Sequence, residues 1–230
     1  DNFGAMGEMP THAELLDHLA SWFVQHGWSL KALHRYILAS AAWQQAGTAR
    51  ARGEALDPGD RLLWRAAPRR LEFEPLRDSL LEVAGHLDRR LGGHSAPLDE
   101  KNLRRAVYGY TDRFRIPALL RNFDVANPDT SVSRRAETLV PLQALFLLNN
   151  PLVRRQAEAL LQRPECARAG DAAERVAALF RLVLSRKPGD DELALAMSFV
   201  GSVPLDRSGA ERWISFAHGL LLSNEFTFVD

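Results

Sequence analysis

Cysteine is nearly absent from this sequence, because Cys166 is the one thiol among 230 residues. A single cysteine excludes a disulfide within the chain, a CxxCH haem attachment and a zinc site built on cysteines. Net charge is absent as well, since 29 Lys and Arg residues balance 29 Asp and Glu residues. This balance removes the broad electrostatic attraction on which non-specific nucleic-acid binding depends, so we expect no nucleic-acid partner.

Long apolar runs are also missing. No stretch reaches the roughly 18 to 20 residues that a bilayer-spanning helix needs, so we expect no membrane span. No basic segment followed by an apolar one opens the chain. The first residues, DNFGAMGEMP, resemble turn residues from the interior of a longer protein, so the lack of a signal peptide is uninformative about compartment. The sequence also has no GxSxG elbow, phosphate-binding glycine loop or dinucleotide fingerprint.

What the chain does have is the composition of a folded globular protein, with 46% hydrophobic and 25% charged residues. Apolar residues recur at helical spacing along most of it, between readable start and stop signals. We therefore predict a mainly α fold: a multi-helix globular domain of helical hairpins, spanning residues 1–230 as one domain. Long irregular loops are expected at 46–60, 91–103 and 110–135, with at most a minor β ribbon.

In the N-terminal part, the first helix is predicted to start at a capping box in which Thr11 and Glu14 satisfy each other's backbone N–H groups. Ser29 is predicted to cap a second helix that packs on the first as a hairpin. A third helix is expected from Leu71 to about Arg90, ended by two glycines. The segment 105–110, RAVYGY, is the best strand candidate.

In the C-terminal part, Thr138 is predicted to cap a helix whose early Pro141 is tolerated in the first turn. Asn150-Pro151 breaks this helix and restarts it. Asp171 repeats the capping pattern before another amphipathic segment, and Ser208 is expected to open the last helix.

Four segments together resemble one family. They are NFGAMGEMPTHAELLDHLASWFVQHGWSLKALHRYILASAAW, RRLEFEPLRDSLL, RRAETLVPLQALFLLNNP and LLLSNEFTFVD. In this order they resemble the C-terminal domain of unknown function, number 1553, of planctomycete-type multidomain proteins. The resemblance implies an exported, extracytoplasmic protein whose upstream domains often include a cytochrome-c-like module. It also implies that the family pattern extends upstream of Asn2, so we expect an excised C-terminal module. No established catalytic residues come with the family.

Arg134 and Arg135 stand just ahead of a long apolar run, near the positive end of a predicted helix, where cations are unfavourable. They need partners elsewhere. One interpretation is that they pair with Asp124, Asp129 or Glu137 of the same chain. The other is that the two guanidinium groups clamp an acidic or sulfated glycan, with help from backbone N–H groups near Thr138.

Glu72 and Glu74, with Asp78 nearby, are candidate acid/base residues, because a facing pair of carboxylates can hydrolyse a glycosidic bond. The alternative is a solvated helix face compensated by neighbouring arginines. His12, Glu14, Asp17 and His18 superficially suggest a metal cluster, but His12 and His18 do not share a helix face, so we predict no metal site.

The sequence therefore predicts a non-catalytic C-terminal interaction module of an extracytoplasmic multidomain protein, without a cofactor. Its expected partners are the upstream domains of the same polypeptide, with a cytochrome-c-like module among them, and an anionic saccharide at Arg134 and Arg135. The alternative is a hydrolytic or redox enzyme module that uses Glu72 and Glu74 and shares its active site with an upstream domain.

Overall fold

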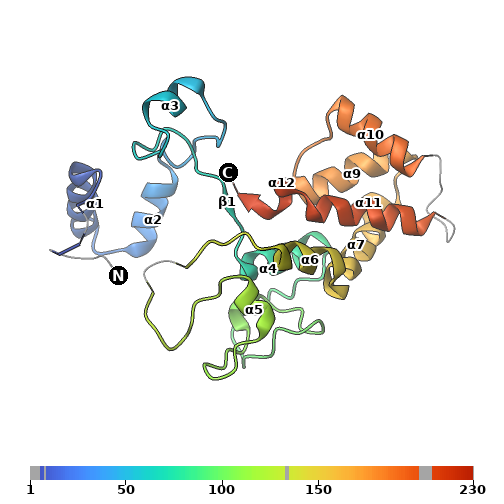
Figure 1. Ribbon diagram of the computed structural model, residues 1–230, viewed down its shortest axis with the longest axis horizontal. Coiled ribbons are helices and arrows are strands. Elements are labelled where there is room, and N and C mark those ends of the chain that lie inside the picture. The colour runs from blue at the N-terminus through green and yellow to red at the C-terminus, as the bar shows by residue number, and fades with distance from the viewer. Residues whose placement is uncertain (1–5, 8, 133–134, 202–208, 230) are drawn as a thin grey trace. The chain divides into compact units, whose positions relative to one another are not determined.

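Helices make up nearly all of the regular structure, as the apolar spacing predicts (Figure 1). The computed structural model describes residues 6–7, 9–132, 135–201 and 209–229. Within these residues the only sheet has two short antiparallel strands, β1 (Arg69–Arg70) and β2 (Phe228–Val229). The mainly α class with a minor β ribbon is confirmed.

The chain divides into two compact units, with unit 1 ending at Arg69 and unit 2 running from Arg70 to Val229. The prediction that residues 1–230 form one domain stays a prediction.

Unit 1 is built on a helical hairpin of α1 (Ala13–Gln25) and α2 (Leu30–Leu38). The tight connection has positive φ at Gly27 and at Trp28, a conformation that costs a non-glycine residue strain. Ser29 caps α2 as predicted, because its side chain accepts a hydrogen bond from the backbone N–H of Ala32. The predicted capping box of α1 is wrong: the helix begins at Ala13, so Thr11 lies outside the capping position and instead contacts the His12 ring.

The rest of unit 1 is irregular except for α3 (Ala51–Leu56), which falls inside the predicted loop 46–60. The indole of Trp64 lies directly over Gly53, where a Cβ atom would collide with the ring. The Trp64 side-chain N–H donates to the carbonyl of Asp57 at 2.8 Å. None of the described residues of unit 1 is buried.

Unit 2 contains ten helical segments among its described residues. They are α4 (Phe73–Val83), the 3-10 helix η1 (Ala106–Tyr108), α5 (Ala118–Asn122), α6 (Pro141–Asn149), α7 (Pro151–Gln162), α8 (Pro164–Ala167), α9 (Ala172–Leu184), α10 (Asp190–Val200), α11 (Ala210–Leu222) and α12 (Asn224–Thr227). Helix α11 packs against α7 and α9, and α10 packs against α9 and α11 (Figure 1).

The core of unit 2 is one cluster contributed mainly by α4, α7, α9 and α11. Its fully buried members include Leu80, Leu160, Leu179, Trp213 and Leu221. Burying such side chains contributes about 1.5 to 3 kcal/mol each, which is the main driving force for folding this unit. Cys166 lies in the same cluster, and burial raises the pKa of its thiol to about 11. The thiol is therefore neutral and packs as an apolar group.

Two of the predicted starts in unit 2 are confirmed. The Asn150 side chain accepts from the N–H of Leu152, and the Asp171 side chain accepts from the N–H of Glu174, both at 2.8 Å. Ser208 lies outside the described residues. The predicted cap at Thr138 is wrong, because α6 begins after Val140.

Two other boundaries also differ from the prediction. Helix α4 stops at Val83, well before Arg90, because Gly85 takes up a positive φ of 77° that ends the helix. The segment 105–110, the best strand candidate, was expected as extended chain or a minor ribbon, and it contains the 3-10 turn η1 flanked by single β-bridges at Arg104 and Gly109.

Candidate functional site

A groove with a volume of 1130 Å³ crosses the surface of unit 2. Its walls come from α4, the η1 loop, the C-terminal end of α9 and α12. Five carboxylates and three guanidinium groups line it: Glu72, Glu74, Asp78, Glu82 and Glu225, with Arg89, Arg105 and Arg135. We call it the acidic groove. Leu91 and Val107 add exposed apolar surface to the lining.

Arg135 spans one end of the acidic groove and is held by two carboxylates. Its Nη1 donates to Glu72 at 2.8 Å and to Glu74 at 2.9 Å, and its Nη2 donates to the other Glu74 oxygen at 3.0 Å. The hydrogen bonds that Arg135 donates to Glu74 are the main reason that the pKa of Arg135 is raised above its usual value. Arg135 is therefore paired within its own chain, as one sequence interpretation expected, although its partners are not the three acids named there.

Glu72 and Glu74 lie side by side, because both bind the same nitrogen of Arg135. Glu72 precedes α4 as its N-cap residue and Glu74 is in its first turn, where negative charge is stabilised by the helix dipole. Two carboxylates therefore share one guanidinium group. This local excess of acidic over basic side chains favours binding of a second cation.

Asp78 lies on the same helix, deeper in the acidic groove. Its side chain accepts a hydrogen bond from the N–H of Ala106 at 2.7 Å, which fastens the η1 loop to α4. Burial raises the pKa of Asp78, and the Ala106 N–H and the nearby charges of Arg77 and Arg105 oppose that rise. Asp78 therefore supports the wall of the groove through a backbone contact.

Arg77 also binds the η1 loop, through a side chain that is buried beneath it. It is 1% exposed, and its guanidinium group donates to the backbone carbonyls of Asn102 and Arg104. Burial lowers the pKa of Arg77, while the charge of Asp78 acts in the opposite direction. The loop has only isolated β-bridges, so few of its backbone groups are paired in a sheet. The buried Arg77 side chain supplies hydrogen-bond donors to two of its carbonyls instead.

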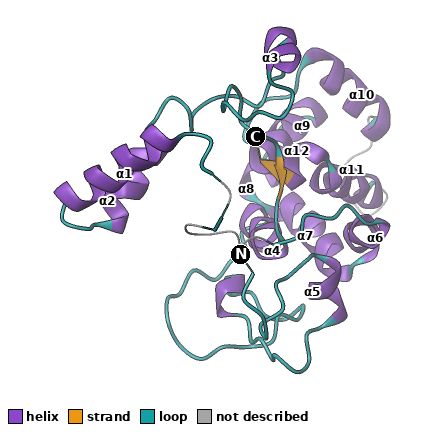
Figure 2. Cartoon of the chain, turned by 60° about the vertical axis from the view of Figure 1, so that its left-hand side comes forward, coloured by secondary structure: helices purple, strands orange, loops and turns teal. Residues whose placement is uncertain are grey.

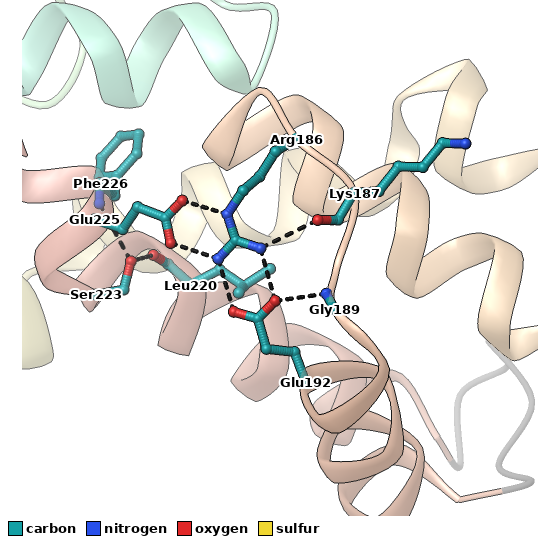
Figure 3. A network of polar contacts seen from close by, with 8 residues as sticks. All are labelled: Arg186, Lys187, Gly189, Glu192, Leu220, Ser223, Glu225 and Phe226. Carbon is teal, nitrogen blue, oxygen red and sulfur yellow. Dashed lines mark hydrogen bonds and ion pairs between the residues drawn. The ribbon is translucent and has the colours of Figure 1, made fainter. Parts of the chain in front are cut away.

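Figure 3 shows an ion-pair network that includes the groove residue Glu225 and is centred on Arg186, just after α9. Arg186 donates to Glu225 through Nε at 2.5 Å and Nη2 at 2.6 Å. It donates to Glu192 through Nη1 at 2.6 Å and Nη2 at 2.7 Å. These bonds raise the pKa of Arg186, and the bond from Arg186 is the largest cause that lowers the pKa of Glu192 to about 2. The network joins α9, α10 and α12 at the groove.

The remaining candidates from the sequence are scattered. Arg134 lies outside the described residues. Asp124 binds Thr138, accepting from its backbone N–H at 2.8 Å and from its hydroxyl group, and this contact explains why Thr138 caps no helix. Asp129 lies 3.7 Å from Arg113.

The histidine and carboxylate cluster of the first helix does not converge. His12 contacts Thr11, and the Nε2 atom of His18 lies 3.0 Å from the hydroxyl group of Tyr36. Across the described ranges, no set of three His, Cys, Asp or Glu side chains is placed to hold a metal ion.

Sequence reasoning missed Glu82, Arg89, Arg105, Arg186 and Glu225 as residues of the groove and its rim. Glu82 pairs with Arg89 and Arg186 pairs with Glu225, which is 39 positions away. Helical spacing does not join Glu82 to Arg89, because helix pairs form between residues three or four apart and these two are seven apart. No local signal joins Arg186 to Glu225.

Comparison with known proteins identifies the family. The family model described as PSD1, a protein of unknown function (DUF1553), matches residues 1–200, so the chain belongs to this family. No curated protein and no solved structure matches the chain. In the part of the chain that the structure describes, every helix is too short or too polar to cross a bilayer.

Proposed function

We propose that this member of the DUF1553 family is a non-catalytic interaction module and that the acidic groove is its binding site. The observation that carries the proposal is the excess of carboxylates over guanidinium groups in the groove, where Arg135 is already shared by Glu72 and Glu74. A cation that enters the groove beside Arg135 meets two carboxylates that share a single guanidinium group, whereas Asp78, Glu82 and Glu225 each have an arginine partner. An anion would first have to displace Glu72 or Glu74 from Arg135.

The ligand that fits this lining is an extended polypeptide segment with lysine or arginine side chains between apolar residues. Basic side chains would reach Glu72, Glu74 and Glu82, and apolar ones would pack on Leu91 and Val107, which are 82% and 69% exposed. Lining residues of both kinds are typical of peptide-binding grooves. The proposal includes the extracytoplasmic setting and the docking to neighbouring domains of the same polypeptide, both of which rest on the family resemblance.

Fluorescence anisotropy tests the proposal with a labelled peptide that alternates lysine and leucine. We expect the full chain to bind it, and the double substitution Glu72→Gln with Glu74→Gln to weaken binding by about tenfold or more. Glu100→Gln is the matched control, because Glu100 pairs with Arg155 outside the groove. Thermal melts of all variants separate loss of binding from loss of folding.

A sulfated oligosaccharide in the same assay distinguishes the other ligand class. Binding of this glycan that is lost in Arg135→Ala, together with no binding of the basic peptide, would replace the proposed ligand by an anionic saccharide. Turnover of a glycan that disappears in Glu74→Gln would instead establish the hydrolytic alternative.

A further inference from the structure

The hairpin of α1 and α2 has an apolar face that no other described residue of unit 1 covers. Leu16 and Val24 on α1 are 56% and 51% exposed, and Leu30 and Leu38 on α2 are 63% and 48% exposed. Neither helix has a buried residue. Two short helices are marginal in water unless an apolar face is buried, so this hairpin needs a further surface.

These four residues belong to two stripes, each repeating every fourth residue, while Leu15 and Tyr36 are exposed outside the stripes at 46% and 41%. On α1 the stripe is Leu16, Ala20 and Val24, and on α2 it is Leu30, His34 and Leu38. Residues four apart lie on one side of a helix. The seam between the helices is made by half-buried residues: Leu19, Trp22 and Phe23 of α1, with Leu33 and Ile37 of α2.

The two stripes lie on the same side of the hairpin. Trp22 and Tyr36 stack with ring centroids 4.6 Å apart, and so mark one side of the seam. Going around the axis of each helix from the seam, the exposed stripe lies on one side and the Trp22–Tyr36 stack lies on the other. Because the helices run in opposite directions, both displacements point to one face, which we call the hairpin face.

Charge divides the hairpin face into an acidic half and a basic half. The charged residues of α1 are Glu14 and Asp17, and those of α2 are Lys31 and Arg35. Asp17 follows Leu16 at the outer edge of one stripe, and Lys31 and Arg35 lie at the outer edge of the other. When a second copy is related to the first by a two-fold rotation, the acidic half of each hairpin face can meet the basic half of the other.

We propose that the hairpin face is closed by a second copy of this chain. The two hairpins form an antiparallel four-helix bundle about a two-fold axis parallel to the helices, so that α1 of each copy packs on α2 of the other. Asp17 then faces Arg35 across the interface, and neighbouring helices all run in opposite directions. The other two-fold arrangement, with α1 on α1, places like charges together and is disfavoured.

Sedimentation velocity over a concentration series of the full chain tests this proposal. We expect a dimer that dissociates on dilution, and an Ala20→Glu variant whose dissociation constant is at least about tenfold higher, because a carboxylate would enter the middle of the apolar face. Leu195→Glu is the control, since Leu195 is 72% exposed on α10 of unit 2. A chain that stays monomeric at every concentration overturns the proposal, whatever else covers the face.

Charge reversal tests the orientation of the two copies. Asp17→Lys and Arg35→Glu should each weaken the dimer, and the two changes combined should restore it to within about threefold of the original chain. A combined variant that is no tighter than the single ones overturns the placement of α1 on α2. His34→Leu should tighten the dimer because it completes the apolar stripe of α2.

Discussion

The two units of this chain both have apolar residues at helical spacing, and yet they differ in how their side chains pack. Unit 1 has amphipathic helices without a single buried residue among those described, whereas unit 2 buries a continuous cluster from four main helices. Apolar spacing specifies a helix and the side that it will bury. It does not specify what will cover that side. The difference therefore shows that correct helix prediction leaves the partner of a helix undetermined.

Matched leucine truncations give the largest expected contrast between the units. Leu160 is fully buried in α7, and Leu160→Ala should destabilise unit 2 by about 2 to 5 kcal/mol, because lost burial and a cavity act together. Leu62 of unit 1 is 69% exposed, and Leu62→Ala should cost less than about 0.5 kcal/mol. Urea unfolding followed by circular dichroism measures both. Equal shifts in midpoint would show that unit 1 has a core of its own.

Removal of the buried cation should have the next largest effect. Arg77→Met keeps an apolar stem but leaves the carbonyls of Asn102 and Arg104 without their donors, at a cost of about 2 to 3 kcal/mol. Hydrogen exchange should become faster in the η1 loop, whose Ala106 N–H is held by Asp78. The control Arg113→Met removes a 64% exposed side chain and should cost less than about 0.5 kcal/mol. Similar losses in the two variants would contradict a supporting role for Arg77.

The smallest expected effect is the pH dependence of the Arg186 network. The pKa of Glu192 is lowered to about 2, so its contribution to stability is complete above about pH 5 and is lost as pH falls toward 2. Because the side chains of this network are 39% to 45% exposed, we expect less than about 1 kcal/mol, and less still in high salt. Arg186→Gln should flatten the stability profile of the chain between pH 5 and 2. An unchanged acid profile in this variant would show that the network does not contribute.

Local signals explain which parts of the fold could be predicted. The caps at Ser29, Asn150 and Asp171 bond to backbone groups two or three residues away, so the sequence contains both partners. Thr138 has the same capping chemistry, but the carboxylate of Asp124 takes its N–H and hydroxyl groups. A contact across 14 positions thus overrides a local preference.

The sequence identified several residues of the candidate site, but it did not show which of them form ion pairs with one another. Arg135, Glu72 and Glu74 were each identified as chemically notable, but for separate roles. The structure joins them in one cluster across 61 to 63 positions, a separation that no periodic pattern encodes. The wall formed by the η1 loop could not be foreseen either, since Arg77 and Asp78 impose its shape from another element.

The antiparallel ribbon brings the first and last residues of unit 2 together. The N–H of Leu71 donates to the carbonyl of Thr227 at 2.8 Å, beside the pairing of β1 with β2 (Figure 2). A folded body whose ends adjoin tolerates circular permutation and insertion into a loop of a host protein without being stretched. Residues 70–229 are therefore suited to transplantation as a cassette, which gives a direct way to study the acidic groove apart from the hairpin.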